Sequence, residues 1–163
     1  MPLIPEDMVA LARRVITDNA AMGRKIALAE SCTGGLVCAA LTEIPGSSAV
    51  LDRGFVTYSN ESKRETLGVP GDIIDTFGAV SVATAWAMAK GALERSGADV
   101  AVAISGIAGP DGGSEQKPVG TVVFAKAIRG SEDCDAEEKH LDGSSRAEVR
   151  RQAALIALEL LVP

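Results

Sequence analysis

The chain has 163 residues, and its 16 Lys and Arg against 22 Asp and Glu give a net charge of −6. This acidic balance argues against a nucleic-acid scaffold, and an aromatic content of 3% leaves few side chains on which bases could stack. The length suits one domain with one substantial core, so we expect residues 1–163 to form a single domain.

The cysteine and histidine content limits the cellular compartment that fits this chain and the kinds of metal or catalytic site that it could build. Cys32, Cys38 and Cys134 form no CxxC pair, and their odd number argues for a reducing cytoplasm rather than a disulfide framework. The single histidine, His140, excludes a multi-histidine metal site but leaves a Ser-His-Asp triad open. The start of the chain lacks the features of a signal peptide, and no uncharged apolar run reaches membrane-spanning length. We therefore expect a cytoplasmic protein without membrane contact.

Helical and strand patterns interleave along the chain. The expected helices span residues 6–22, 36–44, 61–67, 72–77, 81–96 and 145 onward. The expected strands span residues 25–30, 54–58, 99–105, 119–125 and, as a polar edge strand, 136–142. This order predicts an α/β fold, a three-layer α/β/α sandwich around a mixed, partly parallel sheet.

Local signals indicate the ends and faces of several helices. Asn60 is a good N-cap for the helix over 61–67, and Ser145 with Glu148 matches a capping box. The apolar face expected of the first helix consists of Met8, Leu11, Ala12 and Val15. The apolar face expected of the last helix consists of Val149, Ala153, Ile156 and Leu160.

The segment Glu30–Gly35 runs from a strand end into a helix start. Free backbone N–H groups and the helix dipole stabilise negative charge at such a place. Gly34 and Gly35 keep the approach open, so Ser31 could bind an anion or act as a nucleophile, with Cys32 as the alternative nucleophile. An ordinary capped turn fits equally well, because the segment matches neither the GxSxG elbow nor a P-loop.

Tyr58 ends an expected strand, and Lys63 lies in the first turn of the next helix. A lysine beside the positive end of a helix dipole has a lowered pKa if it is also partly buried. Such a lysine can act as a base toward a serine hydroxyl, with a tyrosine as proton relay. The spacing alone fits a solvent-facing lysine better.

Two further segments are candidate binding elements. Ser105–Gly113 is a buried strand end followed by a glycine-rich loop, which is where α/β sheets place ligands, although a flexible turn fits too. Asp111 in this loop and Glu115 just after it are weak evidence for a metal, and we expect none. Arg146 and Arg150 lie one turn apart at the start of the last helix, which suits an anion such as phosphate as well as solvent.

Taken together and in this order, these segments make the sequence resemble the CinA C-terminal domain family of competence- and damage-inducible proteins. The likeness covers nearly the whole chain. It rests on several unusual strings, namely Ala29–Gly35, Gly54–Asn60 with Lys63, Gly78–Ser81, Ser105–Gly113 and Lys117–Val122. The family includes nicotinamide-nucleotide amidases, which hydrolyse the carboxamide of nicotinamide mononucleotide to nicotinic acid mononucleotide and ammonia in pyridine-nucleotide salvage. The resemblance thus implies a single amidase domain of the CinA C-terminal type.

The resemblance also implies residue roles, with Ser31 as the nucleophile, Lys63 as its activating base and Tyr58 as a proton shuttle. The implied substrate-binding residues are Thr33, Gly34 and Gly35 at the anion or oxyanion site, Ser105, Gly106, Ala108 and Gly109 in the nucleotide pocket, and Arg146 and Arg150 at the phosphate. The family pattern before these arginines is Gly-Asp-Arg, whereas here Ser145 replaces the Asp and Gly143 lies one place further away.

A Ser–Lys mechanism requires no metal or organic cofactor. The expected partner is a small-molecule nucleotide substrate, with no nucleic acid and no membrane. The alternative from another class is a non-catalytic nucleotide- or phosphate-binding module acting in competence or the DNA-damage response. A broader amidase for pyridine carboxamides is a second enzymatic alternative. An Ala-rich helix face is compatible with a homodimer.

Overall fold

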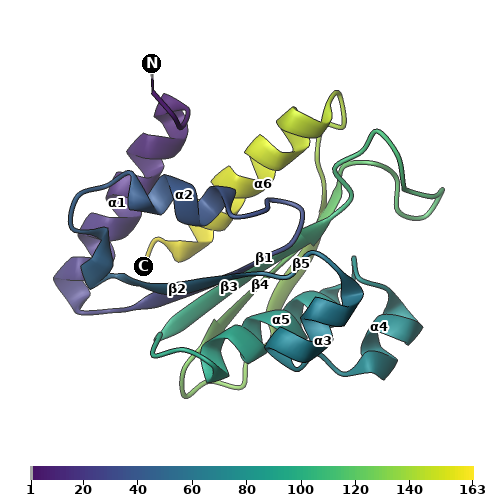
Figure 1. Ribbon diagram of the computed structural model, residues 1–163, viewed down its shortest axis with the longest axis horizontal. Helices are drawn as coiled ribbons and strands as arrows, with labels where there is room; N and C mark the ends of the chain where they lie inside the picture. Colours follow the sequence, from purple (N-terminus) through teal and green to yellow (C-terminus); the bar gives the residue numbers. More distant parts are fainter. Residues whose placement is uncertain (1) are drawn as a thin grey trace.

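The computed structural model describes residues 2–163 and places helices on both faces of one five-stranded sheet (Figure 1). The strands are β1 Ile26–Glu30, β2 Leu51–Val56, β3 Val100–Gly106, β4 Thr121–Ile128 and β5 Asp135–His140. The helices are α1 Glu6–Met22, α2 Leu36–Thr42, α3 Asn60–Leu67, α4 Gly71–Phe77, α5 Val82–Glu94 and α6 Arg146–Leu161, with a short 3₁₀ turn at Ser47–Ala49. Helices α1, α2 and α6 cover one face, and α3, α4 and α5 cover the other. This arrangement confirms the predicted α/β/α sandwich.

The strand order β2-β1-β3-β4-β5 makes the sheet mixed, as expected. Strand β1 pairs in parallel with both β2 and β3, whereas β4 runs antiparallel to β3 and β5 antiparallel to β4. The carboxyl ends of β1, β2 and β3 therefore meet at one edge of the sheet. In an open α/β sheet this edge is where ligands bind.

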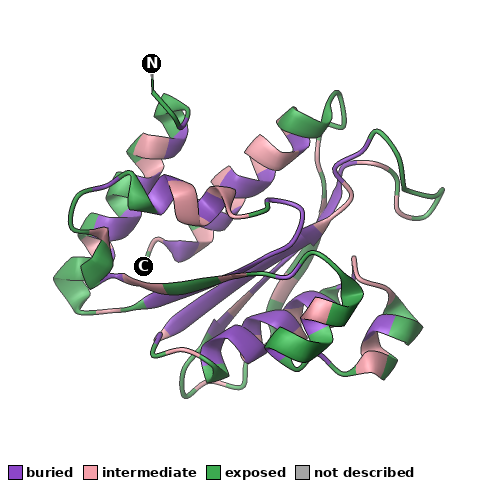
Figure 2. Cartoon of the chain, viewed as in Figure 1, coloured by how far each residue is buried: buried purple, intermediate pink, exposed green. Residues whose placement is uncertain are grey.

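The two faces of the central strands carry side chains of different size. Because successive side chains of a strand point to opposite faces, every second residue belongs to the same layer. The face toward α1, α2 and α6 carries Ile26, Leu28, Val100, Val102 and Ile104. The face toward α3, α4 and α5 carries Ala27, Ala29, Ala101 and Ala103. The central strands are buried over most of their length in Figure 2, as expected for a sheet covered by helices on both faces.

Two details beside the cavity edge of the sheet differ from the predicted elements. Strand β2 begins at Leu51 and ends at Val56, so Tyr58 lies beyond it in a loop. The N-cap of α3 is Ser59, whose Oγ accepts a hydrogen bond from Ser62 N at 3.0 Å, and Asn60 is the first helical residue instead.

The last helix is capped as predicted, since Ser145 Oγ accepts from Glu148 N at 3.0 Å. Its buried face is rotated relative to the prediction, because α6 packs against α1, α2 and the sheet together. Ile156 and Leu160 are only partly buried. The fully buried positions of α6 are Val149, Ala153, Ala154, Ala157, Leu158 and Leu161.

Within residues 2–163, none of the helices combines the length and the apolar character that a bilayer crossing needs.

Candidate active site

The carboxyl ends of the parallel strands bring three distant segments of the chain together. Thr57 N, just after β2, donates to the carbonyl of Glu30 at 2.9 Å, and Ser31 N, just after β1, donates to the carbonyl of Ile104 at 3.0 Å. Ser105 lies at the end of β3 beside them. The first three predicted candidate segments therefore converge at this edge of the sheet.

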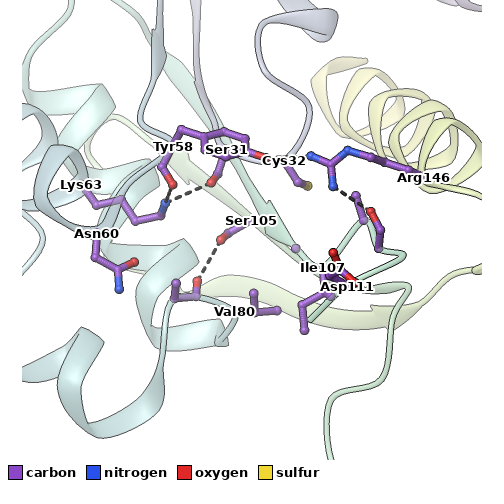
Figure 3. Close-up of a pocket in the computed structure, with 14 residues that line it drawn as sticks. Ser31, Cys32, Tyr58, Asn60, Lys63, Val80, Ser105, Ile107, Asp111 and Arg146 are labelled. Atoms are coloured by element: carbon purple, nitrogen blue, oxygen red, sulfur yellow. Dashed lines mark hydrogen bonds between the residues drawn. The ribbon is translucent and has the colours of Figure 1, made fainter. Parts of the chain in front are cut away.

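A cavity of about 250 Å³ opens where these segments meet (Figure 3). Eight of the site residues inferred from the sequence line it, namely Ser31, Tyr58, Lys63, Ser105, Gly106, Ala108, Gly109 and Arg146. The other lining residues are Cys32, Asn60, Ala79, Val80, Ile107 and Asp111. Four inferred residues, Thr33, Gly34, Gly35 and Arg150, do not line the cavity.

Lys63 reaches from α3 to the serine at the cavity wall. Its side chain is only 1% exposed, and Nζ lies 3.0 Å from Ser31 Oγ. Nζ also donates to the carbonyls of Thr57 at 2.8 Å and Tyr58 at 3.3 Å. Burial lowers the pKa of Lys63, because water no longer stabilises the ammonium form.

The three oxygens match the three N–H donors of an ammonium, and the contact with Ser31 can reverse when the amine is neutral. A neutral lysine has two N–H donors and one lone pair. If the carbonyls of Thr57 and Tyr58 take the two donors, the lone pair is left for the hydroxyl of Ser31. The pair can therefore move a proton from Ser31 to Lys63, which is the chemistry that a serine nucleophile requires.

The start of α2 binds the protein's own carboxylate. Glu30 is fully buried, and its Oε1 accepts hydrogen bonds from Gly35 N at 3.2 Å and Val37 N at 3.1 Å. Its Oε2 accepts from Cys38 N at 3.1 Å. The N–H groups in which the sequence suggested an anion site are thus occupied by Glu30. No role for Glu30 was inferred from the sequence, although a glutamate at a strand end just before a helix start is a usable signal.

Tyr58 contributes two different groups. Its carbonyl holds Lys63, whereas its side chain is 61% exposed and its phenol oxygen accepts from Arg146 Nη2 at 2.7 Å. Among the described residues, Arg146 is the hydrogen-bond partner of this phenol, and neither Ser31 nor Lys63 bonds to it. Arg146 also donates to the carbonyl of Gly109 at 2.8 Å, so its guanidinium bridges two walls of the cavity.

Arg150 has a different environment from Arg146. Its Nε donates to the carbonyl of Cys32 at 3.1 Å, and its Nη2 donates to the carbonyl of Thr33 at 3.2 Å. Its guanidinium therefore joins α6 to the turn that carries Ser31, outside the cavity.

The remaining candidates for nucleophile and base fit less well. Burial raises the pKa of Cys32 to about 11, so its thiol is protonated at neutral pH. His140 lies on β5, beside Thr121 and Glu138, and does not line the cavity, so it cannot complete a triad with Ser31. No three His, Cys, Asp or Glu side chains in residues 2–163 are grouped closely enough to hold a metal ion.

Two polar residues of the cavity were missed as binding candidates. Asn60 lines the cavity. Because Ser59 takes the N-cap role expected of Asn60, the side-chain amide of Asn60 has no hydrogen-bond partner among the described residues. Asp111 was considered only as a weak metal ligand, yet its side chain belongs to the cavity wall (Figure 3). Sequence pattern could not separate these two from ordinary loop residues.

Fold and site together define a three-layer α/β protein with a serine–lysine pair at the carboxyl edge of its sheet. The model of the CinA C-terminal domain family matches residues 8–163, and the chain belongs to this family. The expected family is thereby confirmed.

Individual relatives agree with this assignment. The nicotinamide-nucleotide amidohydrolase PncC of Escherichia coli strain K12 is 48% identical over 155 residues, which cover 95% of this chain and 93% of that protein. A putative competence-damage inducible protein of Symbiobacterium thermophilum is 53% identical over 146 residues, and the match covers 85% of this chain but only 34% of that protein. The chain thus spans about a third of the length of that relative.

A solved structure extends the agreement to the fold. The competence/damage inducible protein CihA from Agrobacterium tumefaciens is 52% identical, with a TM-score of 0.95 over 99% of this chain and 98% of that one.

Proposed function

We propose that this protein is a nicotinamide-nucleotide amidase, which hydrolyses the carboxamide of nicotinamide mononucleotide to nicotinic acid mononucleotide and ammonia. The observation that carries the proposal is the buried amine of Lys63, 3.0 Å from the hydroxyl of Ser31 at the wall of the cavity. Relatives named for this activity, about half identical over most of the chain, support the choice of substrate.

In the first half of the reaction, neutral Lys63 takes the proton of Ser31 as Oγ attacks the carboxamide carbon. The C=O double bond becomes a C–O⁻ single bond, and backbone N–H groups hold the new oxyanion. The tetrahedral intermediate then collapses, the C–N bond breaks, and Lys63 delivers its proton to the leaving nitrogen. Ammonia departs and the nicotinoyl group remains as an ester on Ser31.

In the second half, water attacks this ester. Lys63, neutral again, takes a proton from the water and returns it to Ser31 Oγ as the ester bond breaks. The product is the nucleotide carboxylate. In this scheme Lys63 transfers every proton. The phenol of Tyr58 is hydrogen-bonded to Arg146 and lies beside the bound substrate.

Arg146 is the residue we assign to the phosphate. It lines the cavity, and a guanidinium can bind phosphate through two parallel hydrogen bonds. Its Nη1 donates to the carbonyl of Gly109 and its Nη2 to the phenol of Tyr58, and the guanidinium has further N–H donors for a phosphate. Free nicotinamide has no phosphate and therefore cannot make this contact with Arg146.

Ammonia release from nicotinamide mononucleotide by the purified protein, with and without a chelator, tests the proposal. We expect chelator-resistant release and a preference for the mononucleotide over free nicotinamide that is weakened in Arg146→Ala. Tight nucleotide binding without ammonia would support the non-catalytic module instead. Equal rates on the mononucleotide and free nicotinamide would support the broader amidase.

The free thiols of this chain suit a reducing cytoplasm as the location of the protein. Light scattering would test whether the protein is a homodimer.

A further inference from the structure

The turn after β1 leaves two backbone N–H groups without an oxygen acceptor among residues 2–163. The N–H groups of Cys32 and Thr33 donate to no oxygen, although Cys32 is only 5% exposed and Thr33 is fully buried, and the N–H of Cys32 faces only its own thiol. All the other N–H groups from Ser31 to Cys38 have partners within the protein. Buried N–H groups are nearly always paired, so such an exception beside a cavity indicates a ligand position.

Of these two groups, the N–H of Cys32 is the better placed. Cys32 lines the cavity next to Ser31, whereas Thr33 does not. The N–H of Cys32 shares a peptide plane with the carbonyl of Ser31, and that carbonyl accepts a hydrogen bond from Gly34 N at 3.0 Å. Because the peptide is planar, this bond fixes the direction of the N–H on the opposite side.

Arg150 and Glu30 hold this turn from two sides. Arg150 binds the carbonyls of Cys32 and Thr33 at 3.1 and 3.2 Å, which fixes the two peptide planes that follow the N–H of Cys32. Glu30 binds the N–H groups that follow, at the start of α2, and so prevents them from competing for an anion. The two charged groups leave the turn little freedom to rotate.

We propose that the backbone N–H of Cys32 stabilises the oxyanion of the tetrahedral intermediate, and that Arg150 is a positioning residue for this N–H and not a ligand of the substrate phosphate. The proposal rests on the proposed amidase function. It gives Arg146 and Arg150 separate roles, with Arg146 at the substrate and Arg150 at the turn that carries the nucleophile.

Steady-state kinetics on nicotinamide mononucleotide, combined with calorimetric binding of the product nicotinic acid mononucleotide, separates these roles. The variants are Arg150→Ala and Arg150→Lys. Arg151→Ala is the matched control, because Arg151 lies on the same helix but pairs with Asp7 and Glu148 on the surface. Thermal unfolding of each variant shows that it is folded.

We expect Arg150→Ala to lower kcat by about 10²-fold, the usual effect of misplacing an oxyanion donor, while KM and the product Kd stay within about twofold of wild type. Arg150→Lys should recover part of kcat, since an ammonium can hold one carbonyl but not two. Arg151→Ala should match wild type. If Arg150→Ala does not fold, the Lys variant decides by the same criteria.

Two results would overturn the assignment of Arg150. One is a product Kd that rises tenfold or more while kcat is kept, which would make Arg150 a phosphate ligand. The other is a wild-type kcat in Arg150→Ala. Wild-type protein that releases no ammonia would instead overturn the proposed function, and this inference with it.

Discussion

Replacing Glu30 by glutamine tests whether a buried carboxylate organises the turn of the nucleophile. Glu30 is fully buried and accepts three backbone hydrogen bonds, two on Oε1 and one on Oε2. The glutamine keeps one oxygen acceptor, but its NH₂ group meets an N–H donor where the second oxygen stood. One charge-assisted bond is lost and a buried donor is left unpaired, each of which costs about 1–3 kcal/mol.

We therefore expect Glu30→Gln to lower the free energy of unfolding by about 3 kcal/mol, and Tm by about 10 °C for a domain of this size. Urea and thermal unfolding followed by circular dichroism measure both quantities. Glu43→Gln is the matched control, because Glu43 is exposed at the other end of α2 and should change stability by less than about 0.5 kcal/mol. A Glu30→Gln protein as stable as the Glu43→Gln protein would refute the reasoning.

Three further predictions concern the base, the packing of α3 and the thiols. Because burial lowers the pKa of Lys63 below its ordinary 10.5, kcat/KM should rise as the pH rises through the lowered value. Between the lowered pKa and 10.5 the unfolded chain binds more protons than the folded chain, so wild type should gain stability relative to Lys63→Met as the pH rises through that interval. A difference in the free energy of urea unfolding that moves the other way would contradict this. Gly91→Ala should destabilise the protein by about 2 kcal/mol, because its Cβ would lie 2.0 Å from the carbonyl oxygen of Leu67 in α3. Gly97→Ala is the control, since its Cβ meets nothing closer than 3.8 Å. Equal melting temperatures of the two variants would count against this packing. Iodoacetamide at pH 8 should alkylate the exposed Cys134 well before the buried Cys32 and the partly buried Cys38, as peptide mass mapping would show. Earlier labelling of either would contradict their lower exposure and raised pKa.

The layered fold could be predicted because its signals are local. Alternation of large and small apolar residues in Ile26–Glu30 and Val100–Ile104 predicts buried strands, and helical spacing from Val82 to Leu93 predicts a helix. The ends of the elements were less predictable. Ser59 and Asn60 are both good N-cap residues, so sequence alone could not choose between them.

The sequence indicated which segments meet at the cavity but not the contacts between them. Ser31 and Lys63 are 32 positions apart and meet only because β1 and β2 pair in parallel and α3 returns over the same edge. Arg146 and Arg150 have the same local pattern, yet one lines the cavity and the other binds the carbonyls of the Ser31 turn. Those differences come from tertiary packing, which no local spacing contains.

Ammonia release from nicotinamide mononucleotide by Ser31→Ala and Lys63→Ala, each beside wild type and each shown to be folded, tests the Ser31–Lys63 pair most directly. We predict that either substitution lowers kcat by at least about 10³-fold, and that the double variant loses no more than the single ones, since the two groups act as one unit. Release at the wild-type rate by either single variant would contradict the account.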